Sequence, residues 1–197
     1  MIWNTALVDM IIEQGLMDTD MLATNPFWKK DLELKSPNIT YKYTDEEIEL
    51  FHKCKYDKVY FAECLSVEGS PIKLYPHQKE VLTQITDNRF TAIKQSRQIG
   101  LYLVLAIDVL HQMLFNNDKN IVYTGDKNDG AEFVSKVLSL YKSLPFFMKA
   151  GIIKNKSYSL EFDTGVHLKA IVLDVRCAIG FKIDSLYMDS SYRGESF

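Results

Sequence analysis

The feature that most constrains this chain is a long apolar stretch, Leu101–Phe115, which directly follows Gly100. A shorter apolar segment at residues 90–94 precedes it, separated by a polar run at 95–98. This spacing predicts a strand, then a glycine-ended loop, then a helix. In that layout the loop amides and the amino end of the helix can cradle phosphate groups. Many α/β proteins turn in this way, so the pattern alone indicates a fold class and no activity.

Helical and extended patterns alternate along the rest of the chain. Thr44 and Glu47 form a capping-box pattern that starts a helix, and Pro76 suits the first turn of another helix ending near residue 85. Further on we expect a strand at 120–124, a helix at 130–144, a hairpin of 159–162 with 166–173, and a last strand at 185–189. This order predicts an α/β fold with a mainly parallel sheet flanked by helices and a hairpin insertion.

The first 24 residues differ from the rest. They are rich in methionine and carry apolar residues at helical spacing, including Leu7, Met10 and Leu16. We interpret 1–24 as a helical N-terminal extension and 25–197 as the main domain. The extension either packs on its own domain or docks on another protein.

Charge and composition exclude several classes. The net charge is -3 and the isoelectric point is near 5.8, whereas a dedicated nucleic-acid binder usually carries a basic excess, so direct DNA binding is not expected. A small cluster of Lys149, Lys154 and Lys156 is interpreted as solvated. The four histidines are scattered without ligand spacing, so no metal site is expected.

The compartment is also constrained. The three cysteines are widely spaced and form neither a disulfide framework nor a paired metal-ligand pattern, which suits a reducing cytoplasm. The start of the chain lacks the basic region of a signal peptide. The apolar stretch is interrupted by Asp108, His111 and Gln112 and is too short to span a bilayer. We therefore expect a protein of the host cell cytoplasm with no membrane association.

Residues 96–100, Ser-Arg-Gln-Ile-Gly, resemble the start of the Walker A motif in large terminase subunits of tailed phages of the myovirus type. Segments at 25–30, 59–63 and 72–78 resemble that family's approach to its ATPase core. Segments at 144–145, 151–153 and 159–165 follow in the family's order, and 186–189 resembles its Walker B strand. The resemblance covers roughly residues 25–193. It implies a partial P-loop ATPase domain of the ASCE, RecA-like class.

The first departure from the family lies directly after Gly100. The family places a lysine and then a serine or threonine there, but this chain has Leu101 and Tyr102. The lysine neutralises the β- and γ-phosphates and the hydroxyl residue ligates magnesium. Leucine supplies no charge, and the tyrosine hydroxyl sits too far from the backbone to copy a short ligand. Losing one such clamp typically costs roughly 10²–10³-fold in rate.

Two further departures affect the second half of the site. Asp189 matches the magnesium-associated carboxylate, but Ser190 stands where the family has its catalytic glutamate, and serine is no general base near neutral pH. Ile179 replaces an arginine that the family has before the glycine corresponding to Gly180. The resemblance therefore implies a pseudo-ATPase with no catalytic residues and no required cofactor.

Some residues that match nucleotide-handling positions remain, which leaves room for residual ATP binding. Tyr75 and Gln78 either hold the adenine side or pack a helix start. Arg97 lies in the same loop as Gly100. It either meets a phosphate or serves as a structural or interface arginine. Asp189 is either a metal ligand or a strand-end carboxylate.

The chain ends soon after Asp189, whereas large terminases continue with a lid and a nuclease domain. The resemblance then implies loss of those parts, and a sheet edge that is exposed or covered by residues 1–24. The leading expectation is a catalytically inactive protein, encoded by a phage, a satellite or a host, that binds a large terminase and inhibits or redirects genome packaging. The alternatives are an atypical or split active packaging ATPase, and a module that binds ATP without hydrolysis.

Overall fold

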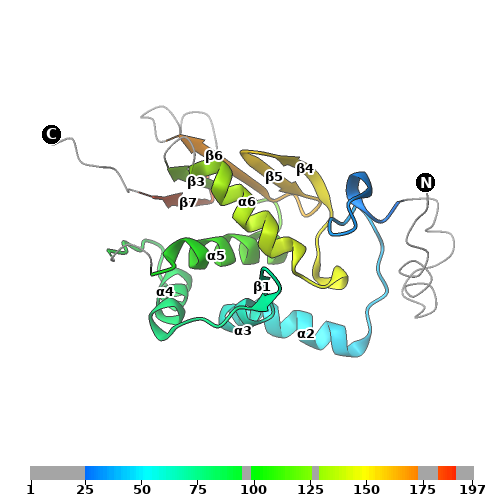
Figure 1. Cartoon of the computed structure of the whole chain (residues 1–197), viewed down its shortest axis with the longest axis horizontal. Helices are drawn as coiled ribbons and strands as arrows, with labels where there is room; N and C mark the ends of the chain where they lie inside the picture. Colours follow the sequence, from blue (N-terminus) through cyan, green and yellow to red (C-terminus); the bar gives the residue numbers. More distant parts are fainter. Residues whose placement is uncertain (1–24, 95–98, 126–128, 173–181, 190–197) are drawn as a thin grey trace.

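A computed structural model describes residues 25–94, 99–125, 129–172 and 182–189 (Figure 1). The described helices are α2 (Asp45–Tyr56), α3 (Lys58–Glu63), α4 (Pro76–Asp87), α5 (Leu101–Phe115) and α6 (Asp129–Lys142), with short 3-10 turns η2 (Trp28–Lys30) and η3 (Phe146–Met148). The described strands are β1 (Ser66–Val67), β2 (Ser70–Pro71), β3 (Asn120–Gly125), β4 (Ile152–Lys156), β5 (Ser159–Phe162), β6 (His167–Val172) and β7 (Ser185–Met188). The expected N-terminal helix, 1–24, lies outside the described residues.

The main sheet has five strands in the order β4-β5-β6-β3-β7. Strand β3 pairs in parallel with both β6 and β7, while β5 pairs antiparallel with β6 and β4. The mixed α/β class is confirmed, but the expectation of a mainly parallel sheet is only partly right. The hairpin is part of the sheet, and β4 extends it further.

The predicted strand at 90–94 is wrong. Residues 91–94 have no regular secondary structure, and Phe90 is 85% exposed. An apolar run forms a strand only if a neighbouring strand satisfies its backbone groups, and no described strand pairs with this segment. Helix α5 nevertheless begins at Leu101, as its pattern predicts.

The helices pack on one face of the sheet. Helix α6 contacts β3 and β6 and packs against α5, and α3 and α4 pack on α5 in turn (Figure 1). Side chains alternate along β6, so Leu168 and Ala170 are buried while His167 and Lys169 are exposed. The core therefore lies between this face of the sheet and the helices.

The polar residues that interrupt α5 have defined partners. Asp108 is completely buried, pairs with Lys58 at 2.5 Å, and accepts a hydrogen bond from the Tyr187 hydroxyl. Gln112 donates to Asp108 at 3.0 Å and accepts from Ser185 at 2.8 Å. This network ties the edge strand β7 to α5 and α3. No helix among the described residues is long and apolar enough to cross a membrane.

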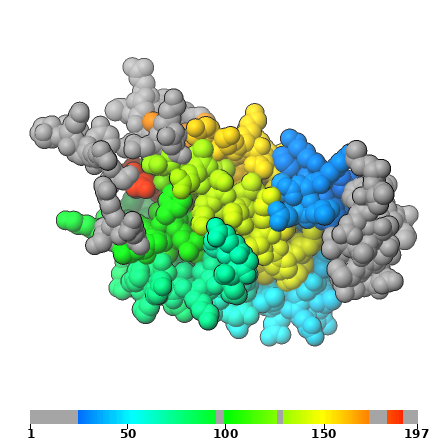
Figure 2. Space-filling view, in the orientation of Figure 1, coloured from blue at the N-terminus to red at the C-terminus, as the bar shows by residue number. Residues whose placement is uncertain are grey.

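The arm before α2 runs beside the start of β4 (Figure 2). The Ile152 amide donates to the Lys35 carbonyl at 2.9 Å. Beside this junction Lys149 is buried, and its Nζ donates to the carbonyls of Glu33 and Lys142. The interpretation of Lys149 as solvated is wrong, whereas Lys154 and Lys156 are exposed as expected.

Candidate functional site

The turn before α5 is held from α4. Gly100 has φ +79° and caps the amino end of α5. The carbonyl oxygen of Ile99 accepts from the Gln78 Nε2 at 3.1 Å and lies 3.2 Å from the His77 Nε2. Arg97 lies outside the described residues. The described part of the loop is thus fixed by the first turn of α4.

Gln78 has both ends of its amide engaged. Its Oε1 accepts from the Tyr75 backbone amide at 3.0 Å, which forms the reciprocal contact of a capping box, and its side chain is buried. A Cβ at Gly100 would clash with the Gln78 Nε2. Gln78 therefore has a structural role here, whatever else it binds.

Tyr75 is placed differently. Its ring is 66% exposed and stacks on His77, with the ring centroids 5.8 Å apart. These two rings form an exposed aromatic pair directly beside the Gln78–Ile99 contact. A planar base could stack on this pair, because stacking needs only an open ring face.

Tyr102 packs into a cluster of aromatic rings. Its ring meets Phe133 edge-on at a centroid distance of 5.3 Å, and Tyr123 stacks on Phe133 at 3.9 Å. The Tyr102 hydroxyl donates to the Asp129 carbonyl at 3.3 Å. We call Tyr102, Tyr123 and Phe133 the aromatic cluster. It joins the first turn of α5 to β3 and α6.

Asp189 lies beside this cluster, directly after β7. Its Oδ2 accepts from the Tyr123 hydroxyl at 3.3 Å, and its backbone amide donates to Thr124 at 2.9 Å. At the same strand end the buried Thr124 Oγ1 has no hydrogen-bond partner among the described residues. Tyr123 thus links the aromatic cluster to Asp189.

The surroundings of the cluster are acidic. Burial raises the pKa of Tyr102, and the carboxylates of Glu132, Asp129 and Asp189 raise it further. Burial and then Asp189 likewise raise the pKa of Tyr123. A polyphosphate needs positive charge around it, but among the described residues the charged groups that act on both hydroxyls are carboxylates.

The hydroxyl and the carboxylate that match the family's magnesium ligands both have protein partners here. The Tyr102 hydroxyl donates to a carbonyl, and the Asp189 carboxylate already accepts from Tyr123. Within the described ranges, no group of three or more His, Cys, Asp or Glu residues could hold a metal ion.

The structure sorts the sequence-predicted residues into two places. Tyr75, Gln78 and Gly100 meet at the start of α4 and α5, while Tyr102 and Asp189 meet through Tyr123. Leu101 is half-buried in the first turn of α5. Ile179 and Ser190, like Arg97, lie outside the described residues.

Sequence reasoning missed Tyr123 and Phe133. The available signal was an aromatic residue inside an otherwise aliphatic strand and another in the first turns of the following helix. No protein-family model matches the chain.

Proposed function

We propose that this chain is a catalytically inactive relative of the terminase ATPases that binds a phage large terminase subunit and inhibits or redirects genome packaging. The observation that carries the proposal is the packing of Tyr102 in the aromatic cluster, at the position where the resembled family has its magnesium-ligating hydroxyl. The aromatic cluster and the carboxylates beside it occupy the place where a phosphate-binding site needs positive charge.

Two features of the fold support the proposal of a partial P-loop domain, although the strand expected at 90–94 is absent. Three parallel strands, β6, β3 and β7, end at the same edge of the sheet, and Asp189 follows the last of them. Ligands of open α/β sheets bind at that edge. Helix α5 begins at a glycine with a left-handed backbone, as a phosphate-binding loop requires.

Inactivity has several independent sources. Leu101 has no charge to set against phosphate, and Ser190 offers no general base. The described framework is nevertheless well built, because the buried Asp108 has three partners that hold α5, α3 and β7 together. An intact framework around an altered site favours a binding role over a decayed enzyme.

Packaging motors of the resembled family are rings of like subunits whose neighbours complete each active site. A subunit-like chain that docks on such a ring without hydrolysing ATP would block or redirect it. This gives inhibition a simple physical basis.

The deciding experiment is a pulldown of the tagged chain from infected cells, with the captured proteins identified by mass spectrometry. The purified large terminase is then assayed for ATPase and packaging activity with and without the chain. We expect terminase capture and loss or change of packaging. Failure to capture any packaging protein would overturn the proposal.

The exposed Tyr75–His77 pair favours a second candidate, a module that binds ATP without hydrolysis. Tyr75→Ala is the better test variant, because Gln78→Ala would also release the Ile99 turn. Measurable ATP affinity in calorimetry that falls in Tyr75→Ala would support this candidate. ATP turnover above background would instead indicate an atypical or split ATPase.

A further inference from the structure

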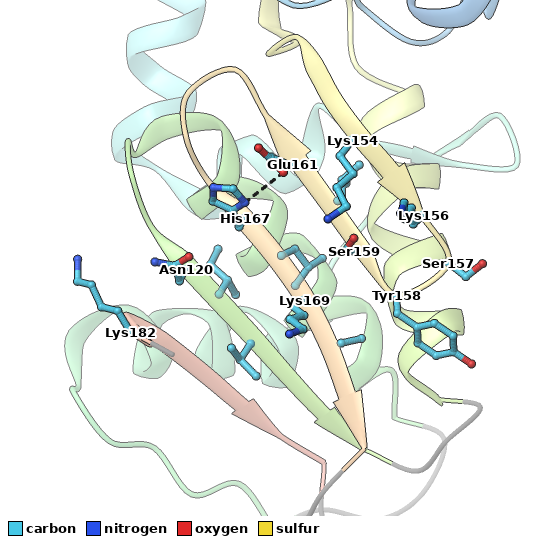
Figure 3. Close-up of a pocket in the computed structure, with 15 residues that line it drawn as sticks. Asn120, Lys154, Lys156, Ser157, Tyr158, Ser159, Glu161, His167, Lys169 and Lys182 are labelled. Atoms are coloured by element: carbon cyan, nitrogen blue, oxygen red, sulfur yellow. Dashed lines mark ion pairs between the residues drawn. The ribbon is translucent and has the colours of Figure 1, made fainter. Parts of the chain in front are cut away.

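The described helices leave the outer face of the five-stranded sheet open. The exposed residues His167 and Lys169 project from β6 on the side opposite the buried Leu168 and Ala170. A hollow of about 560 Å³ lies on this outer face, over β3 to β6 (Figure 3). On this face Val122 and Thr124 of β3 are buried, whereas Leu186 and Met188 of β7 and the lysines of β4 and β6 are exposed. Parallel strands are normally covered on both faces, so the exposed flanks of this face leave room for an occupant.

One side of this face is basic. Lysines gather around the hollow from separate parts of the chain: Lys154 and Lys156 on β4, Lys169 on β6, and Lys182 just before β7 (Figure 3). The acidic residues beside them are Glu161, 3.3 Å from His167, and Asp184, 3.1 Å from Lys182. Glu161 is the cross-strand neighbour of Lys154, but among the described residues no ion pair joins a carboxylate to Lys154 or Lys156. The face is thus locally basic in a chain of net charge -3.

The other side of the same face is apolar. The strand register places one row across the sheet: Lys156, Ser159, Lys169, Val122 and Leu186. In the next row Met188 lies beside Thr124. Leu186 is 49% and Met188 63% exposed. Along the first row the side chains therefore change from lysines on β4 and β6 to the exposed Leu186 on β7, and the second row adds Met188 on the apolar side.

The row is wide enough to seat one helix. Strands are spaced by about 4.8 Å, so the row from β4 to β7 spans roughly 19 Å. A helix with its side chains is about 10–12 Å across. A helix lying along β6 and β3 would reach both the lysines and the two exposed apolar side chains.

We propose that the outer face of the sheet docks an acidic amphipathic helix of a partner protein. Carboxylates on one side of that helix face Lys154, Lys156 and Lys169. Apolar residues on the adjoining side cover Leu186 and Met188. The proposal rests on the proposed function in one respect, that the chain acts by binding a protein, and it names the chemistry of the contact.

Nucleic acid fits this face less well. It would engage the lysines, but its sugar-phosphate backbone would leave Leu186 and Met188 exposed, and the acidic net charge of the chain opposes its approach. A protein helix with an acidic stripe beside an apolar stripe can contact both the lysines and the two exposed apolar side chains.

The test uses the full chain labelled with ¹⁵N and a designed 16-residue peptide. The peptide carries glutamates on one helical stripe and leucines on the adjoining stripe. Comparison probes are a peptide of the same composition in permuted order, a Glu→Gln version, and a 16-base-pair DNA duplex. We expect the amphipathic acidic peptide to bind most tightly and to shift amide resonances of β3, β6 and β7.

Two variants locate the contact. We expect K154E/K156E to weaken peptide binding roughly ten-fold, since each exposed pair changes from attraction to repulsion, and Leu186→Ser to weaken it about five-fold. The matched control K42E/K73E makes the same charge change at exposed lysines outside the sheet, and should leave affinity unchanged.

Several results would overturn the inference. They are tighter binding by DNA, equal binding by the permuted peptide, equal effects of the two double variants, or no binding by any peptide at millimolar concentration. Ten-fold tighter peptide binding after deletion of residues 1–24 would also overturn it, because the chain's own segment would then be the occupant.

A second arm separates this inference from the proposed function. Purified large terminase is titrated into wild type and K154E/K156E. Equal terminase binding by both proteins overturns the docking face while the proposed function stands. Specific peptide binding without terminase binding supports the docking face while the proposed function fails.

Discussion

The side-chain amide of Gln78 donates to the carbonyl oxygen of Ile99 over 3.1 Å, and so joins the start of α4 to the residue before the glycine that caps α5. The Gln78 side chain is also where a Cβ on Gly100 would have to go. The turn is therefore shaped by the buried side chain of Gln78, the same residue that the resemblance places on the adenine side of the site.

Gly100→Ala should destabilise the protein by about 2–3 kcal/mol. A left-handed backbone costs a non-glycine residue about 1–2 kcal/mol, and displacing the Gln78 amide loses a hydrogen bond that contributes about 1 kcal/mol. Urea unfolding followed by circular dichroism measures the change.

Gly69→Ala is the matched control. Gly69 has nearly the same backbone angle, φ +78°, but open space around the added methyl group. Its cost should stay near the backbone contribution alone, about 1–2 kcal/mol. Equal losses in the two variants would show that the Gln78 contact adds nothing.

Asp108→Ala should cost about 3–5 kcal/mol, because it leaves the Lys58 ammonium half-buried without its partner and removes the acceptor of Tyr187 and Gln112. Tyr187→Phe should cost about 1.5–3 kcal/mol, as expected for a hydrogen bond to a charged group. Urea unfolding of both variants provides the measurement.

The double variant Lys58→Met with Asp108→Leu forms a double-mutant cycle with the single variants Lys58→Met and Asp108→Leu. It should be more stable than Asp108→Ala, because no buried charge remains unpaired. A double variant as unstable as the sum of two single variants would contradict a coupled pair.

Stability should fall as the pH drops from about 6.5 to about 4. Burial lowers the pKa of His111 to about 4, and the positive charge of Lys58 contributes to that shift. In the unfolded chain the histidine has an ordinary pKa near 6.5. Between about pH 6.5 and pH 4 the unfolded chain is therefore protonated at His111 and the folded chain is not, so protonation favours unfolding. The loss should reach about 3 kcal/mol at the acid end. Urea unfolding at several pH values should show a slope that His111→Gln reduces.

Restoring the family's residues with L101K/Y102T should produce no ATPase activity. Ser190 still occupies the position of the catalytic glutamate and cannot act as a general base near neutral pH. Threonine at position 102 also removes one of the three rings of the aromatic cluster. Removing a large packed side chain costs about 3–5 kcal/mol, so the variant should also melt earlier. A coupled phosphate-release assay and a thermal melt test the two effects, with Tyr102→Phe as the control that keeps the ring. Phosphate release above wild type would contradict the expectation.

Local chemistry made several elements predictable from the sequence. Thr44 and Glu47 make both contacts of the capping box, and Pro76 starts α4. The apolar stretch after Gly100 forms α5 with the predicted bounds. Each of these depends on residues a few positions apart, which a sequence displays directly.

Elements that depend on distant partners were missed. Residues 90–94 have strand composition but no partner strand, whereas β4 has the unpromising sequence Ile-Ile-Lys-Asn-Lys and pairs with β5. In the sequence Asp108 is only an interruption of an apolar run. Its ion pair with Lys58 and its hydrogen bond from Tyr187 depend on distant parts of the chain. At the candidate site, the identity of Tyr102 was visible in the sequence, but its packing on Phe133 was not.

The lysines of the open sheet face have a consequence for how the molecule behaves as a charged body. With an isoelectric point near 5.8 the protein as a whole migrates as an anion at neutral pH, yet Lys154, Lys156 and Lys169 give one side the opposite sign. A local basic face on an acidic chain favours approach of an acidic partner in one orientation. Isoelectric focusing therefore reports only the average charge of the molecule, while a charged resin or a partner encounters the face turned toward it.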